Sequence, residues 1–457
     1  MIEIITKINS AVNNFVWGPV MLLLLVGTGV YLTARTGCIQ AAKFGYIMRN
    51  TVGSLFRRRE KRDKDAKNLT PFQAVTTALA GTVGTGNIAG VTGAIFAGGP
   101  GAVFWMWFAA FFGMFTKFAE IVLALKYRQV DENGVHYGGP MYYIEKGLGM
   151  KWLAVLFSLV AGFACFGIGN ISQSSEIAGA MEGLFGMSGL TTGVLLAVVV
   201  GIVVLGGVQR IGRVTSYMVP FMAIFYIGAG LAVILLRIDQ VPAALASIFT
   251  SAFSFEAVGG GVFGYAIMVA MRQGFARGVF SNEAGLGSAP MAHAASETQE
   301  PVEQGMWGVF EVFIDTIVIC TLPSLAVILS GVLDVGLDSY ATNGAAAVAA
   351  FNAILPGTIG GTIIQISLLF FALSTILGWS YYGERCWAYL SNNNKAVVWI
   401  FKVVFVLVCI VGATGNGTLM WDISDTLNGM MAIPNLIGLL LLSNVIIRST
   451  NDYFKKH

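Results

Sequence analysis

The sequence predicts an all-α integral membrane protein with about eleven transmembrane helices. Of its 457 residues, 56% are hydrophobic and 11% are charged, and its mean hydropathy is +0.74. An ordinary soluble domain carries about 25% charged residues. Long apolar runs separated by short polar loops are the second observation. Each run is close to the roughly 20 residues that a helix needs to cross a bilayer core, where it satisfies its own backbone groups.

The apolar runs set the expected helices in chain order. The length criterion predicts spans over 15–34, 71–97, 102–127, 152–183, 190–207, 214–236, 262–289, 306–333, 362–389, 396–413 and 430–447. The apolar segment 240–255 is too interrupted to cross, and we expect it to be an interfacial helix at the outer surface. The five cysteines stand singly, mostly inside apolar runs, so we expect them to be packing residues.

Basic residues predict the orientation in the cell membrane. The run "RRREKRDKDAK" (57–67) follows the first span. By the positive-inside rule we place it in the cytoplasm, which puts the amino terminus outside and the carboxyl terminus in the cytoplasm. We interpret the run as a topology signal, with binding of a protein or anionic lipid as the alternative. The same placement puts most other basic residues on the cytoplasmic side: Lys126, Arg128, Lys146, Lys151, Arg210, Arg213, Arg385, Lys395, Arg448, Lys455 and Lys456.

After the first span, the other ten divide into two sets of five. An odd number of helices per set makes the second set enter the membrane from the opposite side, which predicts an inverted repeat. We therefore divide the chain into an extra helix with its basic loop (1–69), a first repeat (70–237), the interfacial segment (238–261), and a second repeat with the carboxyl-terminal tail (262–457). Each repeat begins with a glycine-interrupted span, and such pairs indicate a transporter binding site near the membrane midplane.

The interruptions are "ALAGTVGTGNIAG" (78–90) and "GVFSNEAGLGSAP" (278–290). Each glycine weakens a helix by about 1 kcal/mol relative to alanine, and an unwound helix frees polar groups that hydrocarbon cannot satisfy. Carbonyls at a helix carboxyl end suit a cation, and amides at a helix amino end suit a carboxylate. A zwitterionic amino acid fits both. The alternative is that the glycines merely let helices approach closely.

Three motifs resemble the alanine or glycine:cation symporter (AGCS) family of prokaryotes, and the similarity spans essentially the whole chain. They are "TALAGTVGTGNIAGVTGAIFAGGPGAVFW" (77–105), "GGPMYYIEKGLG" (138–149) and "FSNEAGLGSAPMAHA" (280–294). The resemblance implies a leucine-transporter-like fold with a 5+5 inverted repeat after one extra helix. It also implies symport of alanine or glycine with sodium by alternating access.

The resemblance implies roles for the first break. In "AGTVGTGN" (80–87), the amides of Thr85 and Gly86 are expected to hold the substrate carboxylate. The carbonyl or hydroxyl of Thr82 is expected to serve the ammonium, and Asn87 to bind the nearer sodium.

A second sodium site is also implied by the resemblance. The carbonyls of Ala80 and Val83 are expected to line it, together with the hydroxyls of Ser374 and Thr375 and the carbonyl of Phe371 from "FALSTILGW" (371–379). Hydroxyl and carbonyl oxygens are the hard donors that sodium prefers. Hydroxyls in a helix often bond back to their own turn, which is the alternative.

Further polar and aromatic residues complete the predicted substrate pocket. Asn170 and Gln173 share one face of the fourth span with Phe166, where they either bind substrate or join helices. Ser281 and Asn282 come from the second break. Phe280 and Trp379 are candidates to seal the pocket against water, with plain packing as the alternative.

Charged residues inside the spans need partners, because an unpaired charge at depth costs at least about 2.5 kcal/mol. Asp315 is a candidate ligand of the nearer sodium, and Glu311, one turn before it, could instead pair with Arg272 or Arg277. Lys117 and Glu120 lie three residues apart. Either they neutralise each other, or Glu120 caps the unwound backbone.

A proton-coupled amino-acid transporter is the alternative function, with Asp315 or Glu311 as proton carrier. A channel is less well supported, because the spans lack the regular polar face of a pore. An enzyme is not expected, since the three histidines are scattered over a loop, a helix end and the tail. We expect sodium, a small amino acid and membrane lipid as partners, and no nucleic acid. A monomer is compatible with the sequence.

Overall fold

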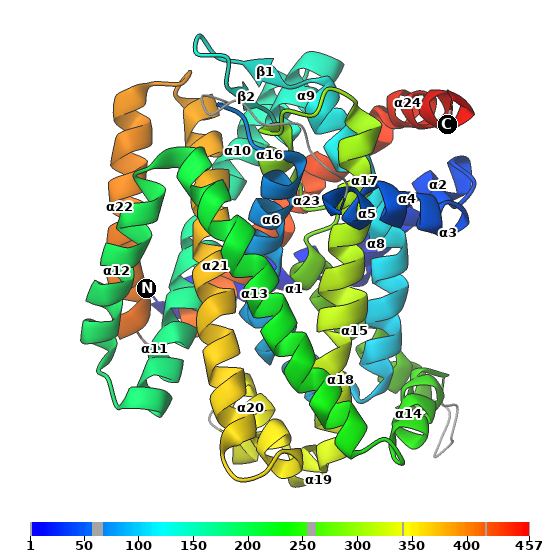
Figure 1. The fold of residues 1–457 in the computed structure, drawn as a ribbon, viewed down its shortest axis with the longest axis vertical. Coiled ribbons are helices and arrows are strands. Elements are labelled where there is room, and N and C mark those ends of the chain that lie inside the picture. Colours follow the sequence, from blue (N-terminus) through cyan, green and yellow to red (C-terminus); the bar gives the residue numbers. More distant parts are fainter. Residues whose placement is uncertain (1, 57–66, 254–261, 341, 416–417, 457) are drawn as a thin grey trace.

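The computed structural model describes residues 2–56, 67–253, 262–340, 342–415 and 418–456, and these form an almost entirely helical protein (Figure 1). The first half contains α1 (Ile2–Val16), α2 (Pro19–Arg35), α3 (Ile39–Ala42), α4 (Phe44–Asn50), α5 (Val52–Leu55), α6 (Pro71–Thr82), α7 (Ala89–Gly98), α8 (Gly101–Lys126), α9 (Pro140–Leu148), α10 (Lys151–Phe166), α11 (Ser172–Phe185), α12 (Gly189–Val204) and α13 (Gly207–Leu236). Its short elements are η1 (Thr85–Asn87), the antiparallel strands β1 (Gln129–Val130) and β2 (His136–Tyr137), and η2 (Gly167–Ile171).

The second half continues the helical pattern. It contains α14 (Val241–Phe253), α15 (Val262–Asn282), α16 (Pro290–Ala294), α17 (Pro301–Val312), α18 (Thr321–Ser330), α19 (Val332–Val335), α20 (Asn343–Ile354), α21 (Ile359–Leu390), α22 (Lys395–Thr414), α23 (Thr418–Leu441) and α24 (Ser443–Lys456), with the short elements η3 (Phe313–Ile319) and η4 (Leu337–Ser339).

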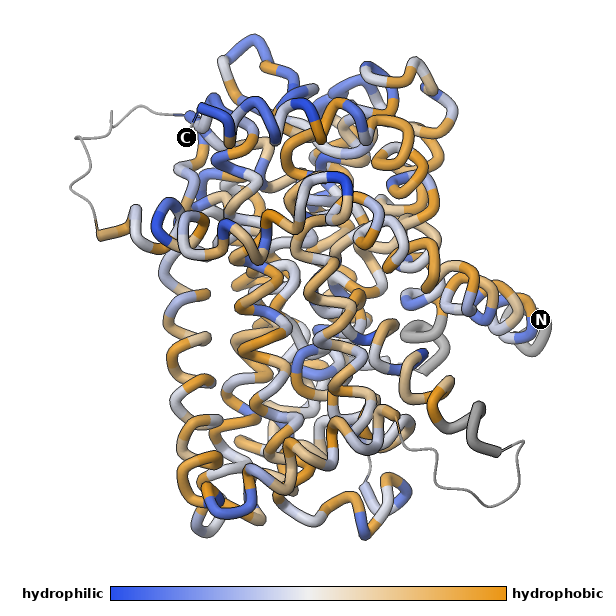
Figure 2. Tube along the Cα trace, turned by 90° about the vertical axis from the view of Figure 1, so that its right-hand side faces the viewer, coloured by the Kyte–Doolittle hydropathy of each residue, from blue (hydrophilic) through white to orange (hydrophobic). Residues whose placement is uncertain are grey.

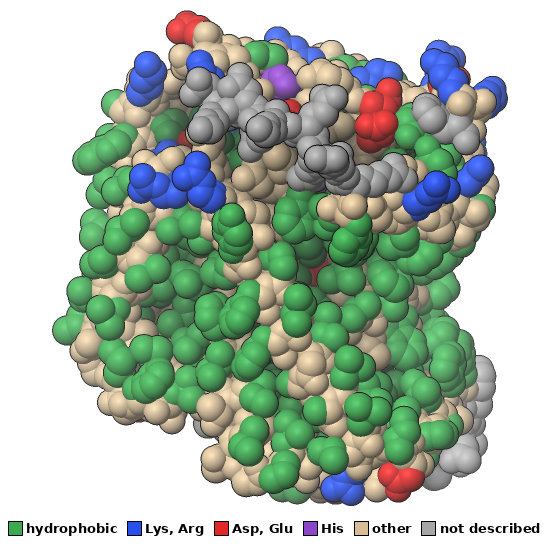
Figure 3. All heavy atoms as spheres, in the orientation of Figure 1, with side chains coloured by type: hydrophobic (Ala, Val, Ile, Leu, Met, Phe, Trp, Pro, Cys, Tyr) green, Lys and Arg blue, Asp and Glu red, His purple; other side chains and the backbone are tan. Residues whose placement is uncertain are grey.

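The arrangement fits a membrane protein. Among the described residues, seven helices are long and apolar enough to cross a bilayer, or up to nine if each bent pair is one span. Hydrophobic residues run along the middle of the helices in Figure 2, and Lys and Arg gather near the upper end of the face seen in Figure 3. We call that end, which carries β1, β2, α9 and α24, the hairpin end. The opposite end carries α14, α19 and α20 (Figure 1).

The first predicted interruption is present. The helix α6 starts with a capping box, in which Thr70 and Gln73 exchange backbone-to-side-chain hydrogen bonds of 3.1 and 3.0 Å, and Pro71 takes the first helical position. It ends at Thr82, because Val83 is extended and the amide of Gly84 donates to the side chain of Asn87 at 2.9 Å. The pieces on either side of this break are bent by 62°.

The second predicted interruption is also present. After α15 ends at Asn282, the backbone turns through left-handed conformations at Glu283, Gly285 and Gly287, with φ of +55°, +92° and +83°. Glycine adopts such angles without a steric penalty, whereas glutamate rarely does. Helical structure resumes at Pro290.

Close packing holds the first broken helix and η2 against α21. A Cβ atom at Gly378 of α21 would lie 2.6 Å from the amide nitrogen of Gly81, and one at Gly169 of η2 would lie 2.3 Å from the Cβ of Trp379. Small residues therefore let the backbones of α6, η2 and α21 meet at the centre of the molecule.

Several expected boundaries were wrong. The last span, expected over 430–447, is instead α23, which begins at Thr418, and the chain bends by 60° between Leu441 and Ser443. Polar residues near its start lower its mean hydropathy, and of these Asp425 accepts a hydrogen bond of 3.1 Å from Asn13 of α1. The first span begins earlier than residue 15 and is interrupted at Trp17 and Gly18. The segment expected to be an interfacial helix is helical, as α14, whereas most of the basic run (57–66) lies outside the described residues.

Two long spans contain π-helical turns that the sequence did not predict. The fourth span runs from α10 through η2 to α11, and the eighth from α17 through η3 to α18. Such turns often accompany functional sites because they rotate the following side chains and free backbone groups. Both of them lie next to the breaks, and η2 carries Asn170 while η3 carries Asp315.

Candidate functional site

A small polar cavity lies where the two breaks approach each other and α21. Its volume is about 10 Å³, which is roughly the space of one water molecule. Most of the residues around it come from the predicted substrate pocket. It is lined by Gly81, Thr82, Gly84, Gly86, Ile168, Gln173, Phe280, Ser281, Glu283, Thr375 and Trp379.

Gln173 reaches the first break from α11. Its side-chain oxygen accepts a hydrogen bond of 3.1 Å from the hydroxyl of Thr85 and lies 3.5 Å from the amide nitrogen of the same residue. Its amide group donates to the carbonyl of Ile168 at 3.0 Å. The hydroxyl of Thr82 bonds back to its own helix, at 3.3 Å from the carbonyl of Ala78. Gln173 thus orders η1, on which the expected carboxylate ligands lie.

One group of oxygens lies between the end of α6 and α21. The hydroxyls of Ser374 and Thr375 donate to the carbonyl of Phe371 at 2.8 and 2.9 Å, and they lie 3.4 and 3.5 Å from the carbonyl of Val83. The backbone of Ala80 contacts the same helix one turn further along, at Gly378. We call the oxygens of Val83, Phe371, Ser374 and Thr375 the α21 oxygen group. Its donors suit a sodium ion.

A second polar group joins the two breaks to η3. The side-chain amide of Asn87 donates to Asp315 at 2.7 Å and to the hydroxyl of Ser281 at 2.8 Å. Asp315 also accepts from Ser281 and Thr316 at 2.7 and 2.8 Å, and its side chain is fully buried. Cys320, expected to be a packing residue, lies 3.3 Å from the Asn87 amide. Residues far apart in sequence thus form one buried cluster, the Asp315 cluster.

Other predicted pocket residues lie nearby or face elsewhere. Asn282 donates to Thr316 at 3.1 Å and caps the following turn through Ala284, beside the Asp315 cluster. Asn170, however, donates to the carbonyl of Phe405 on α22 at 2.6 Å. Phe166 packs its ring on the same helix, with its centroid 5.9 Å from that of Phe405. For these two residues the structure places the side chains between helices, which is the alternative that the sequence left open.

Glu120 binds the unwound backbone of the second break. One carboxylate oxygen accepts from the amides of Gly285 and Gly287 at 3.0 and 3.1 Å and from the side chain of Asn435 on α23. Asn435 also donates to the carbonyl of Gly285 at 2.8 Å. Of the two alternatives for Glu120, capping of the break is therefore the one that the structure shows, and neutralisation of Lys117 is not.

Lys117 pairs with Glu311 instead, at 3.4 Å, and both side chains are fully buried. The other carboxylate oxygen of Glu311 lies 3.0 Å from Nε2 of His293, whose Nδ1 lies 2.8 Å from the side-chain amide of Gln304. The suggested pairing of Glu311 with Arg272 or Arg277 is therefore wrong. Sequence reasoning missed this network because its partners come from α8, α16 and α17, and no local spacing links them.

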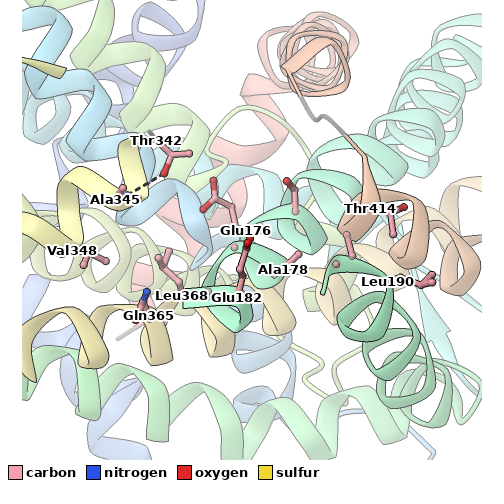
Figure 4. A pocket seen from close by; sticks show the side chains of 16 residues that line it. Glu176, Ala178, Glu182, Leu190, Thr342, Ala345, Val348, Gln365, Leu368 and Thr414 are labelled. Atoms are coloured by element: carbon pink, nitrogen blue, oxygen red, sulfur yellow. Dashed lines mark hydrogen bonds between the residues drawn. The ribbon is translucent and has the colours of Figure 1, made fainter. Parts of the chain in front are cut away.

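A larger hollow lies apart from the breaks, between α11, α20, α21 and α22. Its volume is about 620 Å³, and Glu176, Glu182 and Gln365 are among the residues around it (Figure 4). None of the predicted site residues lines it. Size alone therefore does not locate the candidate site, whereas the broken backbone and the converging oxygens do.

The fold and the site define a class of membrane transporter. A solved structure of MhsT in complex with L-phenylalanine has a similar fold, with a TM-score of 0.58 and 15% identity, covering 86% of this chain and 99% of that one. Two broken helices that meet at a polar cavity are the arrangement of leucine-transporter-like secondary transporters.

The chain belongs to the sodium:alanine symporter family, whose model matches residues 2–457. The sodium/alanine symporter AgcS of Methanococcus maripaludis is 47% identical over 455 residues, covering 99% of this chain and 97% of that protein. The probable sodium/glutamine symporter GlnT of Bacillus subtilis is 36% identical over 459 residues, covering 100% and 92%. The protein is thus a multi-pass, cation-coupled amino-acid symporter and not an enzyme.

Proposed function

We propose that the protein takes up alanine or glycine together with sodium by alternating access. The observation that carries this proposal is the α21 oxygen group beside the first break, because hydroxyl and carbonyl oxygens at a broken helix suit sodium. The aromatic side chains of Phe280 and Trp379 line the cavity next to it, and their bulk favours a substrate with a small side chain. The relative AgcS, a sodium/alanine symporter, supports the same choice.

The proposed substrate lies between the two breaks. Its carboxylate binds the amides of η1 near Gly86, which Gln173 holds in place through Thr85. One sodium ion binds the α21 oxygen group, which includes oxygens from both sides of the contact between the first break and α21. A second sodium ion binds within the Asp315 cluster, where its positive charge compensates the buried carboxylate.

Coupling between the ions and the substrate then follows, because each proposed ion site shares a residue with the substrate cavity. The α21 oxygen group includes Thr375, whose side chain also lines the cavity, and the Asp315 cluster includes Ser281, which does the same. An ion bound at either place stabilises the geometry that the substrate needs. A sodium gradient can drive uptake if the ions and the substrate bind one conformation more tightly together than apart.

We place the hairpin end in the cytoplasm and divide the helices after α2 into two inverted sets of five. The gathering of Lys and Arg near the hairpin end supports the orientation (Figure 3). The occurrence of one broken helix at the start of each set, α6–α7 and α15–α16, supports the inverted repeat.

Changing Ser374 to alanine tests the α21 oxygen group. This change removes one proposed sodium ligand, the hydroxyl oxygen, and hardly alters the packing volume. We therefore expect the sodium concentration for half-maximal uptake to rise about 10-fold. The measurement is uptake of labelled alanine into proteoliposomes against external sodium concentration, with Thr82→Ala and Asn87→Ala compared in parallel. Ser367 on the same helix bonds to its own turn at Ile363 in the described structure, so Ser367→Ala is the matched control.

Two results would count against sodium coupling at this place. An unchanged sodium dependence in Ser374→Ala would remove the α21 oxygen group from the mechanism. Uptake by the unaltered protein that follows a pH gradient and ignores sodium would favour the proton-coupled alternative.

A further inference from the structure

Glu283 places a carboxylate in the wall of the substrate cavity. It is the first residue of the second break, and its side chain is only 2% exposed. Its backbone has a φ of +55°, a left-handed conformation that residues other than glycine rarely adopt. A buried carboxyl side chain on a strained backbone, beside a binding cavity, suggests a functional role for Glu283.

The side chain of Glu283 is fixed by two donors. Its Oε1 accepts a hydrogen bond of 2.9 Å from the indole of Trp379, and its Oε2 is bonded to the hydroxyl of Ser288. The ring of Trp379 packs edge-on against Tyr382, with centroids 5.6 Å apart. Both Glu283 and Trp379 line the cavity, so the hydrogen-bonded pair forms part of its wall.

The carboxylate can still accept further hydrogen bonds. Each carboxylate oxygen has two lone-pair sites, and each is used once by a described protein donor. Trp379 and Ser288 both donate to the carboxyl group, which is the arrangement that an ionised carboxylate, an acceptor only, requires. Part of its accepting capacity therefore remains for a ligand.

The first break offers a weaker partner for an ammonium. The hydroxyl of Thr82 donates its proton within α6, toward the carbonyls of Ala78 and Leu79. Its oxygen can still accept a hydrogen bond, but it is neutral, and a charged acceptor binds an ammonium more strongly. Gly86 of η1 also lines the cavity, and a backbone amide there favours a carboxylate, whereas the amide of Gly84 already donates to Asn87. A cavity with a backbone amide in one part of its wall and a carboxylate in another suits a zwitterion in one orientation.

We propose that Glu283 binds the ammonium of the substrate and so makes the cavity selective for amino acids over carboxylic acids of the same size. This inference rests on the proposed function and adds to it the group that binds the substrate ammonium. A purely structural Glu283, which merely holds Trp379 and Ser288, would affect all ligands of the cavity alike.

The test compares Glu283→Gln with the unaltered protein for three ligands at saturating sodium. Glutamine keeps an oxygen that accepts from Trp379 but removes the charge. Alanine carries both charged groups, alaninamide carries the ammonium alone, and lactate carries the carboxylate alone. Dissociation constants are measured by binding or by competition with labelled alanine.

We expect Glu283→Gln to weaken alanine and alaninamide binding about 10-fold to 100-fold, and to leave lactate binding unchanged or stronger. Glu283→Asp should retain more alanine affinity than Glu283→Gln, because it keeps the charge. Glu176→Gln is the matched control, since Glu176 lines the larger hollow outside the cavity, and it should change none of the three constants (Figure 4).

The proposal is overturned if Glu283→Gln weakens alanine and lactate by the same factor, or if it leaves alanine binding unchanged. These outcomes are distinct from failure of the proposed function. If the proposed function is wrong, the unaltered protein itself will show no sodium-dependent binding of alanine or glycine.

Discussion

Changing Asp315 to asparagine is expected to remove most sodium-dependent uptake. The fully buried carboxylate accepts from Asn87, Ser281 and Thr316. An asparagine keeps the shape, but it loses the charge that a sodium ion would compensate and turns an amide donor toward groups that already donate. We expect the sodium concentration for half-maximal uptake to rise on the order of 10-fold to 100-fold, the factor that corresponds to a lost charge-assisted interaction of about 1.5–3 kcal/mol.

The measurement for Asp315→Asn is alanine uptake against sodium concentration in proteoliposomes. Asp334→Asn, which changes an exposed aspartate on α19, is the control and should leave the sodium dependence unchanged. If Asp315→Asn keeps the sodium dependence but loses a dependence on pH, the carboxylate carries protons and the second sodium site is wrongly placed.

Replacing Lys117 with methionine is expected to destabilise the protein strongly. The change leaves the fully buried Glu311 with His293 as its remaining described partner. Removing one member of a buried ion pair typically costs about 3–5 kcal/mol, whereas replacing both members can be almost neutral. We therefore expect Lys117→Met to lower the apparent melting temperature markedly, and the double variant Lys117→Met with Glu311→Gln to regain much of the loss.

Thermal unfolding of the purified protein in detergent measures this effect. Lys126→Met is the control on the same helix, because Lys126 is exposed and bonds to Ser449 near the surface. A double variant that is as unstable as Lys117→Met, or less stable, would show that Lys117 acts through something other than its charge pairing with Glu311.

The two breaks were predictable because several glycines within one apolar run weaken the helix at that point. Gly84 and Gly285 lie where the helices stop. The pairing of Ser374 with Val83 was predictable through the family resemblance and not through composition, since a hydroxyl pair in a helix usually bonds to its own turn. Both kinds of bond are present here.

Contacts between helices that are distant in the chain could not be predicted from the sequence. The periodicity of the fourth span did not reveal the π-helical turn η2, which changes the direction of the side chains after it, so Asn170 faces α22 while Gln173 faces the cavity. In the same way, the spacing of Lys117 and Glu120 suggested that they pair. In the folded protein Glu120 instead binds the second break, and Lys117 pairs with Glu311.

The polar start of α23 shows the limit of hydropathy. Two of its residues, Asp425 and Thr426, accept hydrogen bonds of 3.1 and 3.0 Å from Asn13 of α1. A helix can cross the membrane even where its mean hydropathy over a sequence window is low, because other parts of the protein cover its polar face.

Reciprocal binding of sodium and alanine to the purified protein tests most directly whether ion and amino acid occupy one linked site at the two breaks. Calorimetry would give the alanine dissociation constant at rising sodium concentration and the sodium constant at rising alanine concentration. We expect each ligand to tighten the other by the same factor, as linkage requires. An alanine affinity that is independent of sodium would contradict the account.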